Sequence, residues 1–213
     1  MHIEANDAAP AAHDGTANPA GRGTGAFRGD TWRQFGRFGW ALALRGAALR
    51  RNYRAIATLR LCQWAAARGD VFSRMLLVVA RLLHRFACGA AGIDLPWQVS
   101  IGPGFALTHG WGAVVNEHAV IGRNVTMFHG ATLGQRDRIG GDGSRSTGYP
   151  VIEDEVWIGP HACIVGAVTI GRGSRVAAGA CVFESVPPHS IVMGNPAQVV
   201  KSGCAPDVMN RWE

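Results

Sequence analysis

The sequence predicts a mainly β protein, a left-handed parallel β-helix of six-residue repeats preceded by a short α-helical N-terminal region. Three observations support this fold class. Aliphatic residues recur at every sixth position beyond Ile93, glycine is abundant with 29 of 213 residues, and apolar residues recur at spacings of three and four between about residues 30 and 89. No helix or ordinary strand has a period of six, whereas a short strand followed by a turn does, and three such units close a triangular coil.

Residues 1–27 are rich in Ala, Gly, Asp, Asn and Pro and contain almost no large apolar side chains. Such a segment cannot bury enough apolar surface to offset the entropy lost on ordering, so we expect a disordered tail. The N-terminus has no charged stretch followed by an apolar one. The sequence therefore predicts no secretory signal, and the cytoplasm is the expected compartment.

Residues 28–92 are expected to form a basic α-helical region. Asp30 is the expected N-cap, Gly69-Asp70 separates two helical stretches, and we expect two or three helices, the last over about 71–86. Twelve arginines of this region face two aspartates. This charge favours an anionic partner, for which we expect the inner face of a membrane rather than a nucleic acid. Helices that only scaffold an oligomer are the open alternative.

The β-helix is expected over residues 93–200, followed by a C-terminal tail over 201–213. Small or β-branched residues lie two positions before the aliphatic ones, and glycine often follows them. Stacked coils would bury the aliphatic column and pair neighbouring backbones about 4.8 Å apart. The column consists of Leu95, Ile101, Leu107, Val115, Ile121, Met127, Leu133, Ile152, Ile158, Ile164, Ile170, Val176 and Val182.

The period of six is interrupted twice. The repeat after Leu107 is two residues too long, which predicts a bulge at the corner formed by residues 109–112. The repeat after Leu133 is thirteen residues too long, so residues 134–150 are expected as an extruded loop. Long loops on a repeat fold are uncommon unless they serve a function.

The bulge contains the first candidates for chemistry. Counting repeats in threes places Met127 above Leu107, so His109 and His129 should stack at one corner. The same count places Asp94 near that corner. A carboxylate behind an imidazole fixes its tautomer and stabilises its protonated form, as a base that takes a hydroxyl proton requires. We expect His109 to be the catalytic base, Asp94 to orient it, and His129 to bind the acceptor or orient the loop.

Several stretches of the β-helix resemble the serine acetyltransferase branch of the hexapeptide-repeat acetyltransferases, over about residues 93–200. Within this branch the chain looks closest to the colanic acid and exopolysaccharide biosynthesis acetyltransferases, which also have a short helical N-terminus. The resemblance rests on Ile93-Asp94-Leu95, Thr108-His109-Gly110-Trp111-Gly112-Ala113-Val114-Val115-Asn116-Glu117, Ala131-Thr132-Leu133-Gly134, Val186-Pro187-Pro188 and Gly194-Asn195-Pro196-Ala197.

The resemblance implies an enzyme that moves the acetyl group of acetyl-coenzyme A directly to a hydroxyl, with no metal. Members of the family use an Asp–His dyad, and the spacing of Asp94, Ile101 and His109 is similar to the family's. The resemblance also implies a homotrimer with active sites between subunits and the pantetheine arm along the coils. Small residues and the single lysine are the expected cofactor contacts: Gly134, Gly159, Ala177, Ala178 and Lys201.

Two departures from the family argue against L-serine as the acceptor. Thr108 stands where the family has Asp, and Gly148-Tyr149-Pro150 stands where it has Arg-His-Pro, whose Arg and His help to hold the amino acid. Trp111 and Tyr149 would suit a sugar, whose apolar face stacks on aromatic rings. With Glu117 they form the expected acceptor set. We therefore expect O-acetylation of a sugar or polysaccharide precursor, with serine O-acetylation as the alternative.

Two further classes stay open at this point. A metal enzyme like the γ-carbonic anhydrases shares the solenoid, but it needs three histidines around a zinc ion, and the usual pair of histidines five residues apart is missing. A non-enzymatic scaffold would have no use for the dyad spacing or the extruded loop. The sequence does not identify the acceptor hydroxyl or the pathway, and it does not say whether trimers pair.

Overall fold

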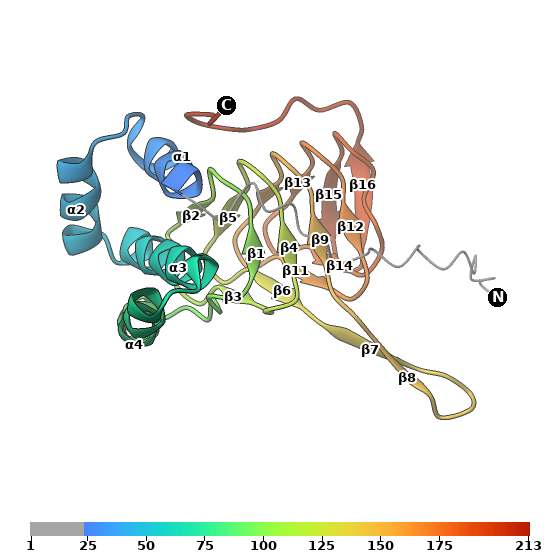
Figure 1. Ribbon diagram of the computed structural model, residues 1–213. Helices are drawn as coiled ribbons and strands as arrows, with labels where there is room; N and C mark the ends of the chain where they lie inside the picture. The colour runs from blue at the N-terminus through green and yellow to red at the C-terminus, as the bar shows by residue number, and fades with distance from the viewer. Residues whose placement is uncertain (1–23) are drawn as a thin grey trace.

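The computed structural model describes residues 24–213, so the predicted tail lies outside the described residues over 1–23. For residues 24–27 the prediction of a tail is wrong, because they form the first turn of a helix. Helices occupy most of the region up to residue 91 (Figure 1). They are α1 (Thr24–Phe35), α2 (Trp40–Leu49), α3 (Arg51–Arg68) and α4 (Val71–Ala91), against the two or three expected.

Gly69 and Asp70 separate α3 from α4 as the sequence predicts. Gly69 has a φ of 72°, a left-handed conformation that glycine adopts without strain at a helix end. The Asp70 side chain accepts a hydrogen bond from the Ser73 N–H at 2.9 Å and so caps α4. The prediction that Asp30 caps the first helix is wrong. Asp30 lies inside α1, and its carboxylate is buried in a contact with another helix.

The chain then winds through three parallel sheets, which form the three faces of a left-handed β-helix (Figure 1). The first face contains β1 (Ser100–Ile101), β4 (Val120–Ile121), β9 (Val151–Ile152) and β12 (Thr169–Ile170). The second contains β2 (Ala106–Thr108), β5 (Thr126–Phe128), β10 (Trp157–Ile158), β13 (Arg175–Val176), β15 (Ile191–Gly194) and the antiparallel β16 (Ala197–Lys201). The third contains β3 (Val114–Val115), β6 (Thr132–Gly134), β11 (Cys163–Val165) and β14 (Cys181–Val182).

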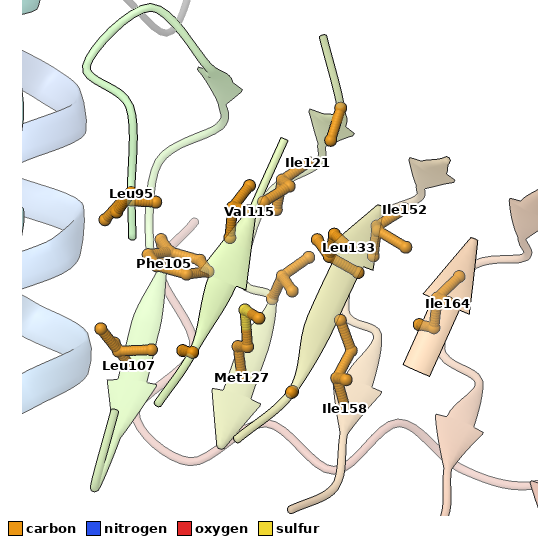
Figure 2. Close-up of a cluster of buried hydrophobic side chains, with 14 of the residues drawn as sticks. Leu95, Phe105, Leu107, Val115, Ile121, Met127, Leu133, Ile152, Ile158 and Ile164 are labelled. Atoms are coloured by element: carbon orange, nitrogen blue, oxygen red, sulfur yellow. The ribbon is translucent and has the colours of Figure 1, made fainter. Parts of the chain in front are cut away.

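The predicted aliphatic column is confirmed as the core of the β-helix (Figure 2). Each of its residues is at most 5% exposed. Leu107 pairs with Met127, and Met127 with Ile158, in the register that the repeat count predicts. The column stabilises the stack because each coil buries its aliphatic side chains against those of the next coil.

The extruded segment is a β-hairpin rather than an irregular loop. Strands β7 (Arg136–Ile139) and β8 (Arg145–Gly148) pair in antiparallel register and project away from the coils (Figure 1). The Asp137 carboxylate joins the strands, accepting hydrogen bonds from Arg145 at 2.9 Å and Thr147 at 2.8 Å.

The helices cover the open edge of the first coil, and their side chains bind backbone groups that a preceding coil would otherwise pair. This matters because a buried backbone group without a partner is costly. The contacts are Arg33 with Gly104 O (3.0 Å), Arg60 with Ile101 O (2.8 Å) and Gly102 O (2.7 Å), Gln63 with Val99 O (3.0 Å), His84 with Leu95 O (2.7 Å) and Asp30 with Phe105 N (2.8 Å).

A buried ion pair fixes α1 to α3 at this edge. Arg60 Nε lies 2.6 Å from Asp30 Oδ2, and both side chains are almost completely buried. Burial raises the pKa of the Asp30 carboxyl, while the charge of Arg60 acts in the opposite direction. The two groups also satisfy backbone groups of the first coil, so the pair connects two helices and the β-helix.

The segment after Lys201 returns along the outside of the coils towards α1 (Figure 1). Asn124 and Trp212 exchange two hydrogen bonds, at 2.8 and 2.9 Å. The Trp212 ring also lies 6.3 Å from that of Trp32 in α1. Arg211 pairs with the buried carboxylate of Glu155. The C-terminal tail is thus held against both the coils and the helical region.

Candidate active site

Three histidines line the edge where the second face turns into the third. His109 follows β2, His129 follows β5, and His161 lies shortly after β10. The ring centroids of His109 and His129 are 6.4 Å apart, and those of His129 and His161 are 5.0 Å apart. We call these residues the histidine edge. The stacking of the first two is as the repeat count predicts.

His161 is the member of this edge that the sequence reasoning missed. It lies three residues past a column residue, whereas His109 and His129 lie two past theirs. The backbone corner is nevertheless shared, because the His161 N–H donates to the His129 carbonyl at 2.9 Å. A count from the column therefore does not align it with the other two.

The bulge after β2 fixes His109 and Trp111 at this edge. The Trp111 N–H donates to the His109 carbonyl, and the Gly130 N–H donates to the Trp111 carbonyl at 2.9 Å. A Cβ at Gly110 would lie 2.6 Å from the Leu107 side chain, so the bulge needs glycine there. The Trp111 ring is 66% exposed and free to contact a ligand.

The two predicted histidines differ in burial. His109 is exposed, as a base that must reach a substrate should be. His129 is half-buried, and its Nδ1 is buried without a hydrogen-bond partner among residues 24–213. An unpaired buried polar atom costs about 1–3 kcal/mol, so a polar group bound beside His129 would be stabilising.

Asp94 lies at the start of the third face, beside the bulge. It pairs with Val114 through a parallel bridge, and its N–H donates to the Ala113 carbonyl at 2.9 Å. The preceding turn touches the bulge, because a Cβ at Gly92 would lie 2.4 Å from the Trp111 ring. The Asp94 carboxylate is exposed. The structure therefore places Asp94 at the end of the face that adjoins the histidine edge.

The carboxylate of Asp94 is not in contact with the His109 ring. In the described part of the chain, the one ion pair between a histidine and a carboxylate joins His118 to Glu117, at 3.7 Å. Both proposed dyad residues are exposed, so neither side chain is held in place by packing. The two side chains must move together before they can form a hydrogen bond. A substrate that contacts both of them would promote this movement.

The predicted acceptor set is divided between two edges of the β-helix. Trp111 lies at the histidine edge, before β3. Glu117 and Tyr149 lie beyond the other end of the third face, where β3 and β6 turn towards the first face. The Tyr149 ring packs on His118 with centroids 4.6 Å apart. We call Glu117, His118 and Tyr149 the tyrosine edge.

The predicted cofactor contacts are divided in a similar way. Gly159 and Ala178 are neighbours on the histidine-edge side, where a Cβ at Gly159 would lie 2.7 Å from the Ala178 backbone nitrogen. Ala177 precedes Ala178 on the coil that follows the coil of Gly159. Gly134 ends β6 on the tyrosine-edge side. Lys201 pairs with Ile191 at the start of β15, so it lies at the opposite end of the second face from Ala177 and Ala178. The structure does not bring Lys201 to them.

The histidine edge is not arranged as a metal centre. Between residues 24 and 213, no three side chains of His, Cys, Asp or Glu are placed to hold a metal ion together. The alternation of a bulge, small residues and imidazoles instead fits an extended substrate lying along the coils, with a hydroxyl near His109.

Comparison with known proteins supports this interpretation. Residues 149–183 match the family described as "Bacterial transferase hexapeptide (six repeats)". The crystal structure of Brucella abortus serine acetyltransferase in complex with coenzyme A has a TM-score of 0.65 and 30% identity to this chain, and the match covers 84% of this chain and 68% of that one. The chain belongs to the hexapeptide-repeat acetyltransferases of the serine acetyltransferase type.

Two other relatives belong to the same group. The serine acetyltransferase of Bacillus pumilus is 35% identical over 129 residues, 61% of this chain and 57% of that protein. The crystal structure of the Neisseria gonorrhoeae serine acetyltransferase in complex with serine has a TM-score of 0.64 and 30% identity, over 83% of this chain and 68% of that one. The chain thus spans little more than half of the Bacillus relative.

These similarities correct the prediction of a sugar acceptor. The relatives are serine acetyltransferases, and nothing among them indicates the closeness to colanic acid or exopolysaccharide enzymes that the sequence suggested. The structure also weakens the argument against serine. An imidazole lies beside position 149 after all, because the His118 ring packs on the Tyr149 ring.

Proposed function

We propose that this protein is a serine O-acetyltransferase, which transfers the acetyl group of acetyl-coenzyme A to the hydroxyl of L-serine. The observation that carries the proposal is the exposed His109 on its bulge, with Asp94 at the adjoining end of the third face. The similarity to serine acetyltransferases supports both the donor and the acceptor. It extends over most of the β-helix, where both residues lie.

The chemistry needs one base and two aligned substrates. His109 takes the proton of the serine hydroxyl as its oxygen attacks the thioester carbonyl, and Asp94 stabilises the imidazolium that forms. Backbone N–H groups at the corner stabilise the developing oxyanion. Collapse of the tetrahedral intermediate breaks the carbon–sulfur bond, and the protonated His109 returns its proton to the leaving thiolate. Alignment of the two substrates contributes much of the remaining acceleration.

The acceptor is held by groups from both edges in this proposal. Trp111 and the unpaired Nδ1 of His129 line the side next to the base. Glu117 offers a carboxylate for the serine ammonium group, and His118 beside Tyr149 offers an imidazole for its carboxylate. The two edges of one chain lie at opposite ends of the third face, so a complete site needs the histidine edge of one protomer and the tyrosine edge of another. A homotrimer with shared sites meets this need.

The donor lies along the coils, with its pantetheine arm over small residues. Gly159 and Ala178 lie close together at the histidine edge, with Ala177 beside Ala178, and Gly134 lies at the end of β6. Lys201 can contact a phosphate of coenzyme A only if the donor extends to the start of the second face. The five cysteines are all unpaired, which is usual in the reducing cytoplasm, our proposed location.

The direct test is release of free thiol from acetyl-coenzyme A with L-serine, compared with a panel of sugars. His109→Ala should lower acetyl transfer to serine by about two to four orders of magnitude, the usual contribution of a general base. Because His109 is exposed, its thermal unfolding should match that of the unaltered protein. Near-full activity in this variant, or a sugar preferred to serine, would overturn the proposal.

A further inference from the structure

Helix α4 buries small side chains and exposes large apolar ones, which is the reverse of the usual arrangement. The residues it buries against the rest of the protein are small or polar: Ser73, Ala80, His84, Ala87, Cys88 and Ala91. Most of its large apolar residues point away from the protein, and eight of them are at least 50% exposed: Val71, Phe72, Met75, Val78, Val79, Leu82, Leu83 and Phe86. We call these eight residues the α4 face. Folded proteins rarely expose so many neighbouring apolar side chains unless another surface covers them.

A row of arginines borders the α4 face. Arg74, Arg81 and Arg85 recur at spacings of seven and four, so they share one side of the helix. All three are exposed, and Arg81 rests over the Trp97 ring, 5.9 Å from its centroid. Helix α4 contains no acidic residue, and Asp70 at its start is used as the N-cap. The apolar stripe is therefore bordered by positive charge alone.

We infer that the α4 face binds the surface of an anionic lipid bilayer. A helix with a broad apolar stripe bordered by arginines lies in the plane of the interface, with its apolar side chains at the acyl boundary and its cations near lipid phosphates. None of the helices between residues 24 and 213 is long and apolar enough to span a bilayer. The contact is therefore peripheral. It is independent of acetyl transfer and goes beyond the proposed function.

Two other occupants fit the α4 face less well. Residues 1–23 contain only Met1 and Ile3 as large apolar residues, too few to cover eight exposed side chains. A second copy of α4 would bring a second row of three arginines and no carboxylate to pair with either row. The charge around the face therefore favours an anionic lipid surface, whose phosphates complement the arginines.

Flotation of the purified full chain with lipid vesicles tests the inference. At low salt the protein should float with vesicles containing roughly one-third phosphatidylglycerol in phosphatidylcholine, and much less with phosphatidylcholine alone. Replacing Phe72, Met75 and Leu82 together with serine should lower the partition coefficient by about a hundredfold or more. Replacing the three arginines with glutamine should lower it by about a hundredfold and remove most of its salt dependence.

Met209→Ser is the matched control, because Met209 is 76% exposed but lies in the C-terminal tail. It should float like the unaltered protein. All variants should keep their acetyl transfer in solution, which separates loss of membrane binding from loss of folding and from failure of the proposed function. No flotation of the unaltered protein at low salt would overturn the inference. So would equal binding to neutral vesicles, or a smaller oligomer in sedimentation when the α4 face is altered.

Discussion

The β-helix and α4 distribute their apolar residues in opposite ways. In the β-helix the aliphatic side chains of the column turn inward and form the core. In α4 small residues turn inward and most of the large apolar ones face out. Both regions have a regular apolar period. A regular spacing of apolar residues shows that they share one side of a helix or coil. Whether that side is buried or exposed depends on which elements pack against it.

The buried ion pair that joins α1 to α3 at the edge of the first coil should be the most sensitive point of the molecule. Asp30→Ala would leave the Arg60 guanidinium buried and without its counter-charge. We expect a loss of about 3–5 kcal/mol in the free energy of unfolding, the usual cost of removing one member of a buried pair. Urea unfolding followed by circular dichroism measures this.

Asp30→Asn is the informative companion, because the amide can still accept the Phe105 hydrogen bond. It should be destabilising too, since Arg60 still lacks a negative partner. If both variants unfold like the original protein, the helical region is not fixed to the coils by this pair.

Truncation of one apolar side chain in each region tests the comparison itself. Ile158→Ala removes atoms from a fully buried position and should cost about 2–5 kcal/mol. Leu82→Ala removes atoms from a side chain that is 55% exposed, and it should change the free energy of unfolding by at most about 0.5 kcal/mol. A large cost for Leu82→Ala would mean that the α4 face is covered in the folded protein.

The smallest expected effect is a pH dependence at the junction. His84 Nε2 lies 2.7 Å from the Leu95 carbonyl and Nδ1 lies 2.9 Å from the Thr58 hydroxyl. Burial lowers the pKa of His84 below its usual 6.5, while the hydrogen bond to Leu95 acts in the opposite direction. Below about pH 6.5 the unfolded chain therefore binds a proton that the folded chain does not, and stability should fall as the pH falls.

His84→Gln removes this titration and keeps a polar side chain. The stability advantage of the unaltered protein over this variant should be largest above about pH 6.5 and should shrink towards pH 5, as measured by urea unfolding. An advantage that grows on acidification would show that the charged imidazole is favoured in the folded state.

The sequence predicts the β-helix well because its core side chains all point inward and recur at a fixed interval of six residues. The pairing of Leu107 with Met127 follows from counting alone. The helical region is harder to predict. Asp30 has the residue type and place of an N-cap, but it is used in an ion pair with Arg60, a residue thirty positions away. No local pattern reports such a contact.

The site was predictable to the extent that it follows the repeat. His109 and His129 each lie two residues past a column residue, and they stack as expected. The relation of Tyr149 to His118 depends on how the hairpin returns to the coils, which its length does not fix. The prediction of a sugar acceptor rested on residues that the chain lacks, and the similarity to serine acetyltransferases overturned it.

The helix side chains that bind Ile101, Gly102, Val99 and Leu95 have a consequence for self-association. Coils that stack without a terminating element present a row of free carbonyl and amide groups, which can template the addition of another chain and so grow into fibres. Here those groups are occupied by arginine, glutamine and histidine. Copies of the protein are therefore discouraged from polymerising end to end at this edge.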